Sequence, residues 1–133
     1  MSLFKALITI IYKVPDLPCA VEYYKKLLGV NPNFEMPFYT GFTIGAGFEL
    51  GIMPLTETDQ DRVIGYWEVG PEIDQVFETF TKMGAVVTSP VTHVGENIYV
   101  AQLRDPCGNP IGIIHNPHYY NKHLQFKEEK PPE

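Results

Sequence analysis

The chain has few cysteines, and it lacks both a long apolar run and an excess of basic residues. Its 133 residues include only two cysteines, Cys19 and Cys107, which are far apart in the sequence. Two separated cysteines supply neither a disulfide framework nor the clustered ligands of a zinc site. Such sparse cysteine usage is typical of a reducing compartment, so we expect a cytoplasmic protein.

Charge and hydropathy exclude further classes of protein. No apolar run approaches the about 20 residues that a membrane-spanning helix requires, and Ile8–Ile11 is too short an apolar run for a secretory signal. The formal net charge is −6, with 10 basic and 16 acidic residues. Phosphate binding needs a basic face. We therefore expect a small-molecule ligand as the partner, with no nucleic acid and no membrane.

The same sequence pattern occurs twice. Each copy begins with an apolar, β-rich run, at Ile8–Val14 and at Val63–Val69. A turn, an amphipathic helix ending at a glycine, several short strand-like segments and a tight hairpin follow in both copies. A repeat of roughly half the chain indicates two modules of related structure. A pair of modules favours a binding site between them.

In the first module we expect a strand over Leu7–Val14, followed by a helix that Asp16 caps and Gly29 ends. The apolar residues of this helix recur at helical spacing and predict its buried side: Leu17, Val21, Tyr24 and Leu28. Three short strands are predicted after it: Asn33–Met36, Tyr39–Ile44 and Phe48–Met53.

The second module repeats this order after a strand over Val63–Val69. The predicted buried side of its helix, which Gly84 ends, consists of Ile73, Val76, Phe77, Phe80 and Met83. The strands that follow are predicted at Ala85–Ser89, Ile98–Leu103 and Pro110–Ile114. Trp67 has the strand parity of a core residue packed on this helix. The pattern is lost from His115 onward, and residues 119–133 are expected to form a tail, of which Gln125–Glu133 is charged and proline-rich.

Two motifs resemble a known family. Val14-Pro15-Asp16-Leu17, with Tyr23-Tyr24 and Leu27-Leu28-Gly29 after it, is similar to the first-helix pattern of the vicinal oxygen chelate superfamily. Arg104-Asp105-Pro106-Cys107-Gly108-Asn109-Pro110 is similar to its last hairpin, in which Gly108 is expected to adopt a positive φ. This superfamily includes glyoxalase I, extradiol dioxygenases, bleomycin-resistance proteins and fosfomycin-resistance enzymes.

The resemblance covers about residues 6–116 and implies an α+β fold. Two βαβββ modules, at about 6–54 and 63–116, would form a curved, cup-shaped mixed sheet within a single domain of residues 1–118. Pairing of the modules within one chain or across a dimer is left open. Because curved sheets leave edge strands and an aromatic face that need cover, we expect a homodimer, with Phe38, Phe42 or Phe48 in its interface.

The resemblance also implies four positions for ligands of a divalent metal, and this sequence has degraded them. They fall at Thr9, Glu49, Ile64 and Gly112, so that Glu49 is the only retained ligand position. A lone carboxylate does not hold a catalytic metal without further His or carboxylate partners. We therefore expect no metal and no cofactor, although a rearranged set that uses other histidines stays open as an alternative.

Strand alternation predicts which side chains line the cup. The predicted ligand-binding residues are Thr9, Ile11, Glu49, Ile64, Tyr66, Glu68, Gly112 and Ile114. Lys13 is expected to pair with Glu68 near the rim. Aromatic residues of the second and third strands are expected either to wall the pocket or to belong to the sheet core or a dimer interface: Phe34, Phe38, Tyr39 and Phe42.

An apolar and aromatic pocket with one acid suits a small aromatic or cationic molecule. The first hypothesis is therefore a binding protein of the bleomycin-resistance type that needs no metal. The alternative is a lyase, isomerase or dioxygenase of the same superfamily. Such an enzyme would be either metal-dependent or metal-free, with Glu49 as general base and Tyr66 or Thr9 as its partner. The sequence leaves open whether the protein is an enzyme.

Overall fold

The structure is a computed structural model of the chain, and it describes residues 3–124. The chain forms two compact units. The first unit consists of residues Ile8–Gly65, and the second combines the N-terminal segment up to Leu7 with the chain from Tyr66 onward. Each unit carries one βαβββ module, which confirms the α+β fold class and the internal repeat.

The first module contains a helix and four strands. In chain order these are β1 (Ala6–Val14), α1 (Leu17–Leu28), β2 (Phe34–Met36), β3 (Tyr39–Ile44) and β4 (Phe48–Pro54). The strands lie in the order β2-β3-β4-β1, with β1 parallel to β4 and the other neighbours antiparallel. As predicted, Asp16 caps α1 by accepting a 3.0 Å hydrogen bond from the Cys19 amide, and Gly29 ends it at a φ of 71°.

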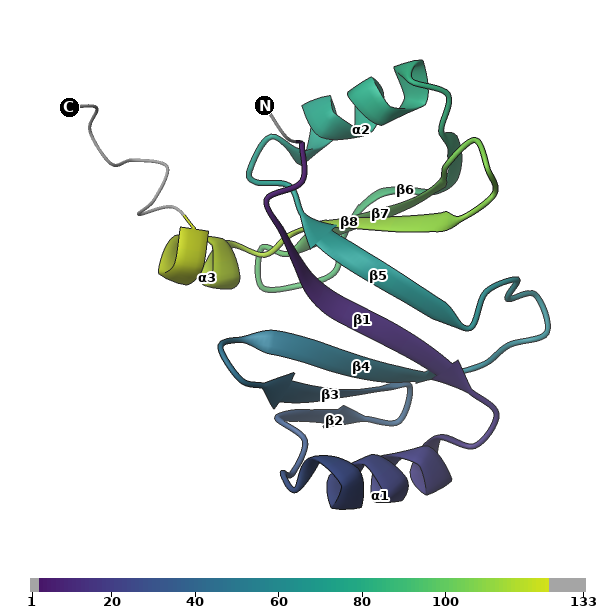
Figure 1. Cartoon of the computed structure of the whole chain (residues 1–133), viewed down its shortest axis with the longest axis vertical. Coiled ribbons are helices and arrows are strands. Elements are labelled where there is room, and N and C mark those ends of the chain that lie inside the picture. Colours follow the sequence, from purple (N-terminus) through teal and green to yellow (C-terminus); the bar gives the residue numbers. More distant parts are fainter. Residues whose placement is uncertain (1–2, 125–133) are drawn as a thin grey trace. The chain divides into compact units, whose positions relative to one another are not determined.

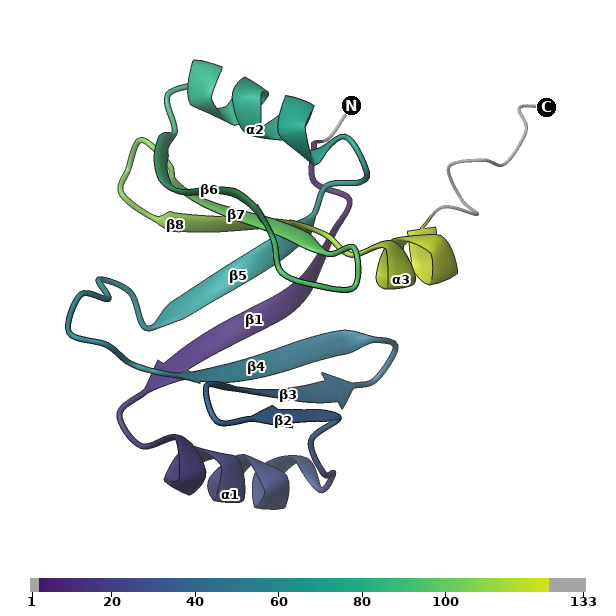
Figure 2. The ribbon, with the colours of Figure 1, turned by 180° about the vertical axis from the view of Figure 1, so that it is seen from behind.

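Helix α1 packs on one face of this sheet (Figures 1 and 2). Val21 of the helix packs against Phe42, Leu50 and Ile52 of the sheet, and the other predicted apolar positions of α1 are partly buried around them. Phe42 is fully buried in this core, so of the predicted alternatives the sheet core is confirmed, whereas the pocket wall and the dimer interface are wrong for this residue. Side chains alternate between the two faces along β3, so Phe42 points toward α1, whereas Tyr39 and Gly41 lie on the opposite face.

The second module has the same order of strands and helix as the first. It contains β5 (Val63–Glu68), α2 (Ile73–Lys82), β6 (Val86–His93), β7 (Tyr99–Arg104) and β8 (Pro110–His115). The strands lie in the order β5-β8-β7-β6, with β5 parallel to β8 through Tyr66–Glu68. Gly108 in the β7–β8 turn has a φ of 93°, which confirms the positive φ predicted there.

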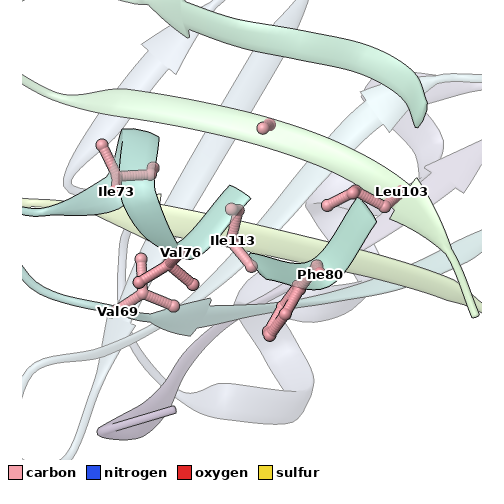
Figure 3. Packing of buried hydrophobic residues seen from close by; sticks show 7 residues of the cluster. Val69, Ile73, Val76, Phe80, Leu103 and Ile113 are labelled. Carbon is pink, nitrogen blue, oxygen red and sulfur yellow. The ribbon is translucent and has the colours of Figure 1, made fainter. Parts of the chain in front are cut away.

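Helix α2 covers one face of β6, β7 and β8. Figure 3 shows Ile73, Val76 and Phe80 of this helix directed toward Leu103 and Ile113 of the sheet. Trp67 belongs to this side as predicted, because Phe4 stacks on it at 4.4 Å between ring centroids and also contacts the edge of Phe80. Met83 does not belong to it: the residue follows the last turn of α2 and is 68% exposed.

Two boundaries differ from the sequence prediction by more than one residue. Strand β6 continues to His93 with two irregularities in its register, where the pattern predicted an end at Ser89. After β8, Asn116 caps a short helix α3 (Pro117–Tyr119), and a π-helical turn η1 (Tyr120–Leu124) follows it. These turns contain too few residues for a helical repeat to be visible in the sequence. The predicted tail segment Gln125–Glu133 lies outside the described residues. No helix in residues 3–124 is long and apolar enough to cross a membrane.

Candidate functional site

Glu49 lies on the face of the first sheet that α1 leaves uncovered. Its neighbours Leu50 and Ile52 point into the core beneath α1, so alternation along β4 directs Glu49 and Gly51 to the opposite face. There the Tyr39 hydroxyl of β3 donates a hydrogen bond to Glu49 Oε2. A phenol and a half-buried carboxylate are thus held together on this face. Composition alone places Tyr39 only among the aromatic residues, whereas its strand parity with Gly41 indicates the face on which it lies.

Two glycines provide the space for the Tyr39–Glu49 pair. A Cβ atom at Gly41 would lie 2.8 Å from Glu49 Oε2, and one at Gly51 would lie 2.6 Å from Ile11 Cδ1 and would also collide with the Tyr39 hydroxyl. Real Cβ atoms do not approach other atoms so closely. The Tyr39 ring therefore lies over backbone that carries no side chains, and larger residues at 41 or 51 would displace it.

The register brings two other predicted residues to the same face. Thr9 of β1 is opposite Glu49, and Ile11 is opposite Gly51. The ring of Phe34, on the edge strand β2, lies 5.9 Å from the Tyr39 ring and is 49% exposed. One face of the first unit therefore combines an acid, a phenol, a hydroxyl and an exposed aromatic ring. Two open grooves of this unit flank α1, and neither is lined by a predicted ligand-binding residue.

In the second unit, the face opposite α2 carries a second polar pair. Gln102 Nε2 of β7 donates a 2.6 Å hydrogen bond to the Tyr66 hydroxyl of β5. Gly112 of β8 lies between them in the register, opposite both Tyr66 and Gln102. Adjacent strands are about 4.8 Å apart, so the two side chains meet above the glycine. Burial raises the pKa of the Tyr66 phenol, and the Gln102 hydrogen bond opposes this rise.

Glu68 is hydrogen-bonded to partners within the second unit. It is fully buried, and its carboxylate accepts hydrogen bonds from the backbone amides of Gly70 and Asn116 at 2.8 and 2.9 Å. His115 Nδ1 lies 2.8 Å from Glu68 Oε2. Lys13 has its ion pair elsewhere, with Asp59 of the first unit at 2.7 Å. The expected Lys13–Glu68 pair is therefore replaced by two pairs, each within one unit.

The predicted ligand-binding residues form two sets. Thr9, Ile11 and Glu49 share one face of the first unit. Tyr66 and Glu68 are opposite Gly112 and Ile114 in the second. Ile64 is buried and belongs to the first unit through the start of β5. That both sets line a single cup stays a prediction.

The register also bears on the metal positions that the resemblance implied. Ile11 and Tyr66 occupy equivalent positions in the two modules, because each lies three residues before the last valine of its apolar run, Val14 or Val69. Ile11 lies opposite Gly51, and Tyr66 lies opposite Gly112. By this internal comparison, Gly51 is the counterpart of Gly112, so the repeat does not support Glu49 as a ligand position. A divalent metal needs several His or carboxylate donors. Thr9, the Tyr39-bound Glu49, Ile64 and Gly112 do not fit that requirement. Within residues 3–124, no three His, Cys, Asp or Glu side chains are grouped to hold a metal.

Comparison with known proteins gives a family. The sequence model of the Glyoxalase/Bleomycin resistance protein/Dioxygenase superfamily matches residues 7–113. Methylmalonyl-CoA epimerase from Mycobacterium tuberculosis has a similar structure, with a TM-score of 0.71 and 18% identity over 91% of this chain and 95% of that one. No curated protein matches the sequence significantly.

Two further solved structures share the fold. A glyoxalase/bleomycin resistance protein/dioxygenase superfamily member from Vibrio splendidus 12B01 has a TM-score of 0.65 and 12% identity, over 84% of this chain and 100% of that one. The E323L mutant of homoprotocatechuate 2,3-dioxygenase from Brevibacterium fuscum has a TM-score of 0.66 and 16% identity, over 85% of this chain and 33% of that one. At such identities the similarity shows the fold alone.

Proposed function

This chain belongs to the Glyoxalase/Bleomycin resistance protein/Dioxygenase superfamily, and from that premise we propose that it binds a small aromatic or cationic molecule without a metal. The observation that carries the proposal is the Tyr39–Glu49 pair on the open face of the first sheet. A carboxylate next to exposed aromatic surface suits a planar cation, because charge-assisted hydrogen bonding and cation–π attraction act together.

The geometry of the pair supports Glu49 as the anchor of this ligand. Tyr39 donates to one carboxylate oxygen, Oε2, and a carboxylate has about four acceptor positions. A ligand with two parallel N–H groups can therefore still bind to Glu49. Phe34 and Tyr39 supply ring surface beside it. The predicted cytoplasmic location and the predicted homodimer stay predictions.

The test is calorimetric titration with benzamidinium and with benzamide, which have nearly the same shape but differ in charge. Glu49→Gln keeps the shape of the side chain and removes its charge, so the affinity for benzamidinium should fall by roughly 1.5–3 kcal/mol, the range for a hydrogen bond to a charged group. The affinity for benzamide should change less.

Glu35→Gln is the matched control, because Glu35 is an exposed acid of β2 in the same unit and its loss changes the net charge equally. The control should bind benzamidinium like the wild type. Equal affinity of wild type and Glu49→Gln for benzamidinium, or no binding by the wild type, would contradict the proposal.

A further inference from the structure

The Tyr66–Gln102 pair has one hydrogen-bond donor and one acceptor left over. Gln102 donates through Nε2 to the Tyr66 oxygen, so the Tyr66 hydroxyl proton and the Gln102 carbonyl oxygen are not used in this contact. Among the described residues, neither side chain has another hydrogen-bond partner. The pair thus presents a donor and an acceptor side by side.

The surroundings fix the position of both groups. Tyr66 is buried, with 8% of its surface exposed. The register places Gly112 of β8 between the two strands that carry the pair. No side chain at 112 stands between Tyr66 and Gln102, and Ile114 adds apolar surface further along β8. Because burial raises the pKa of Tyr66 above 10.0, its hydroxyl keeps the proton at neutral pH.

We propose that Tyr66 and Gln102 recognise a carboxamide group of the ligand: the Tyr66 hydroxyl donates to the amide carbonyl, and the Gln102 carbonyl accepts from the amide N–H. A carboxamide carries an acceptor oxygen and a donor nitrogen on the same carbon, which complements the two free groups of the pair. An amidinium carries donors only, so it cannot accept from Tyr66. The inference rests on the proposed function in that both require a small-molecule ligand, but it uses different residues.

The experiment measures binding of benzamide, acetophenone and ethylbenzene to the whole chain by NMR titration. Acetophenone keeps the carbonyl acceptor and lacks the N–H donor, and ethylbenzene lacks both. We expect benzamide to bind most tightly. Gln102→Leu should weaken benzamide roughly two- to tenfold, the range for one neutral hydrogen bond, and should leave acetophenone nearly unchanged. Tyr66→Phe should weaken both carbonyl compounds.

Gln75→Leu is the matched control, because Gln75 is an exposed glutamine on α2 of the same unit. Gln102→Glu provides a second variant of similar size: its carboxylate accepts a hydrogen bond from the Tyr66 hydroxyl, so this donor is no longer available to the ligand carbonyl and benzamide binding should fall here as well. The inference is overturned if benzamide does not bind, if Gln102→Leu binds it like the wild type, or if Gln102→Leu weakens acetophenone equally.

These outcomes are separate from a failure of the proposed function. That failure appears as an unchanged affinity of Glu49→Gln for benzamidinium, whereas the carboxamide inference is decided by benzamide and the Gln102 variants. Glu49→Gln should leave the order of affinities of benzamide, acetophenone and ethylbenzene unchanged. Reordering of the three probes by Glu49→Gln would therefore also count against the assignment to Tyr66 and Gln102.

Discussion

Lys13 and Asp59 fasten the segment after β4 to the end of β1. Lys13 Nζ lies 2.7 Å from Asp59 Oδ1, and the other carboxylate oxygen of Asp59 accepts a 2.8 Å hydrogen bond from the Thr56 amide. The Lys13 amide also donates to the Arg62 carbonyl at 2.7 Å. One lysine therefore holds the segment both through its side chain and through its backbone.

The Lys13–Asp59 pair should make stability depend on pH in the acid range. The hydrogen bond from Lys13, followed by that from the Thr56 amide, lowers the pKa of Asp59 from 3.8 to about 2. A lowered folded-state pKa stabilises the fold above the unfolded-state value, and this stabilisation disappears as the pH falls through about 2. Asp59→Asn should therefore lower the melting temperature near neutral pH, and the difference from wild type should shrink between pH 4 and pH 2.

Thermal melts over this pH range test the prediction, with Glu57→Gln as the control because Glu57 is an exposed acid of the same segment. Parallel acid profiles for wild type and Asp59→Asn would show that the pair does not contribute.

Removal of the buried Glu68 carboxylate should be costly. Glu68→Ala leaves the amides of Gly70 and Asn116 and the His115 ring without their acceptor. Loss of one partner from such a buried network costs roughly 3–5 kcal/mol. Urea unfolding should show this loss. Glu72 is the exposed N-cap residue of α2 and its side chain makes no capping hydrogen bond, so Glu72→Ala should stay within about 0.5 kcal/mol of wild type. Similar stability of the two variants would refute a structural role for Glu68.

Gly51→Ala should destabilise the first unit through steric overlap. The new methyl group would meet the Tyr39 hydroxyl and Ile11 Cδ1, and overpacking of this kind costs roughly 1–3 kcal/mol. Tyr39→Ala should relieve part of that cost, so the double variant should be more stable than the sum of the two single losses predicts. Additive losses in urea unfolding would show that Tyr39 does not occupy the space above Gly51.

Sequence periodicity sufficed to predict both modules, because each helix has an apolar side and several of the turns contain a glycine with a positive φ. The helix cap at Asp16 and the conformations of Gly29 and Gly108 followed from local chemistry alone. The hydrogen-bond partners did not, since Tyr39–Glu49 and Tyr66–Gln102 join different strands and depend on register. Met83 looked buried because it keeps the helical spacing, but the helix ends before it.

Finally, the Tyr66 phenol should titrate above its ordinary pKa of 10.0, because desolvation by burial outweighs the hydrogen bond from Gln102. Gln102→Leu removes the group that favours the phenolate, so the pKa of Tyr66 should rise further in this variant. Because the pKa of Tyr66 is higher in the folded state than its ordinary value of 10.0, the contribution of the neutral phenol to the stability of the fold is complete below pH 10. This contribution is lost as the pH rises through the folded-state pKa. Alkaline titration followed by the difference in ultraviolet absorbance between each protein and its Tyr66→Phe counterpart isolates Tyr66 from the other tyrosines. Gln75→Leu should titrate like the wild type, and an unchanged or lower Tyr66 pKa in Gln102→Leu would show that the Gln102 amide does not bind the phenol in solution.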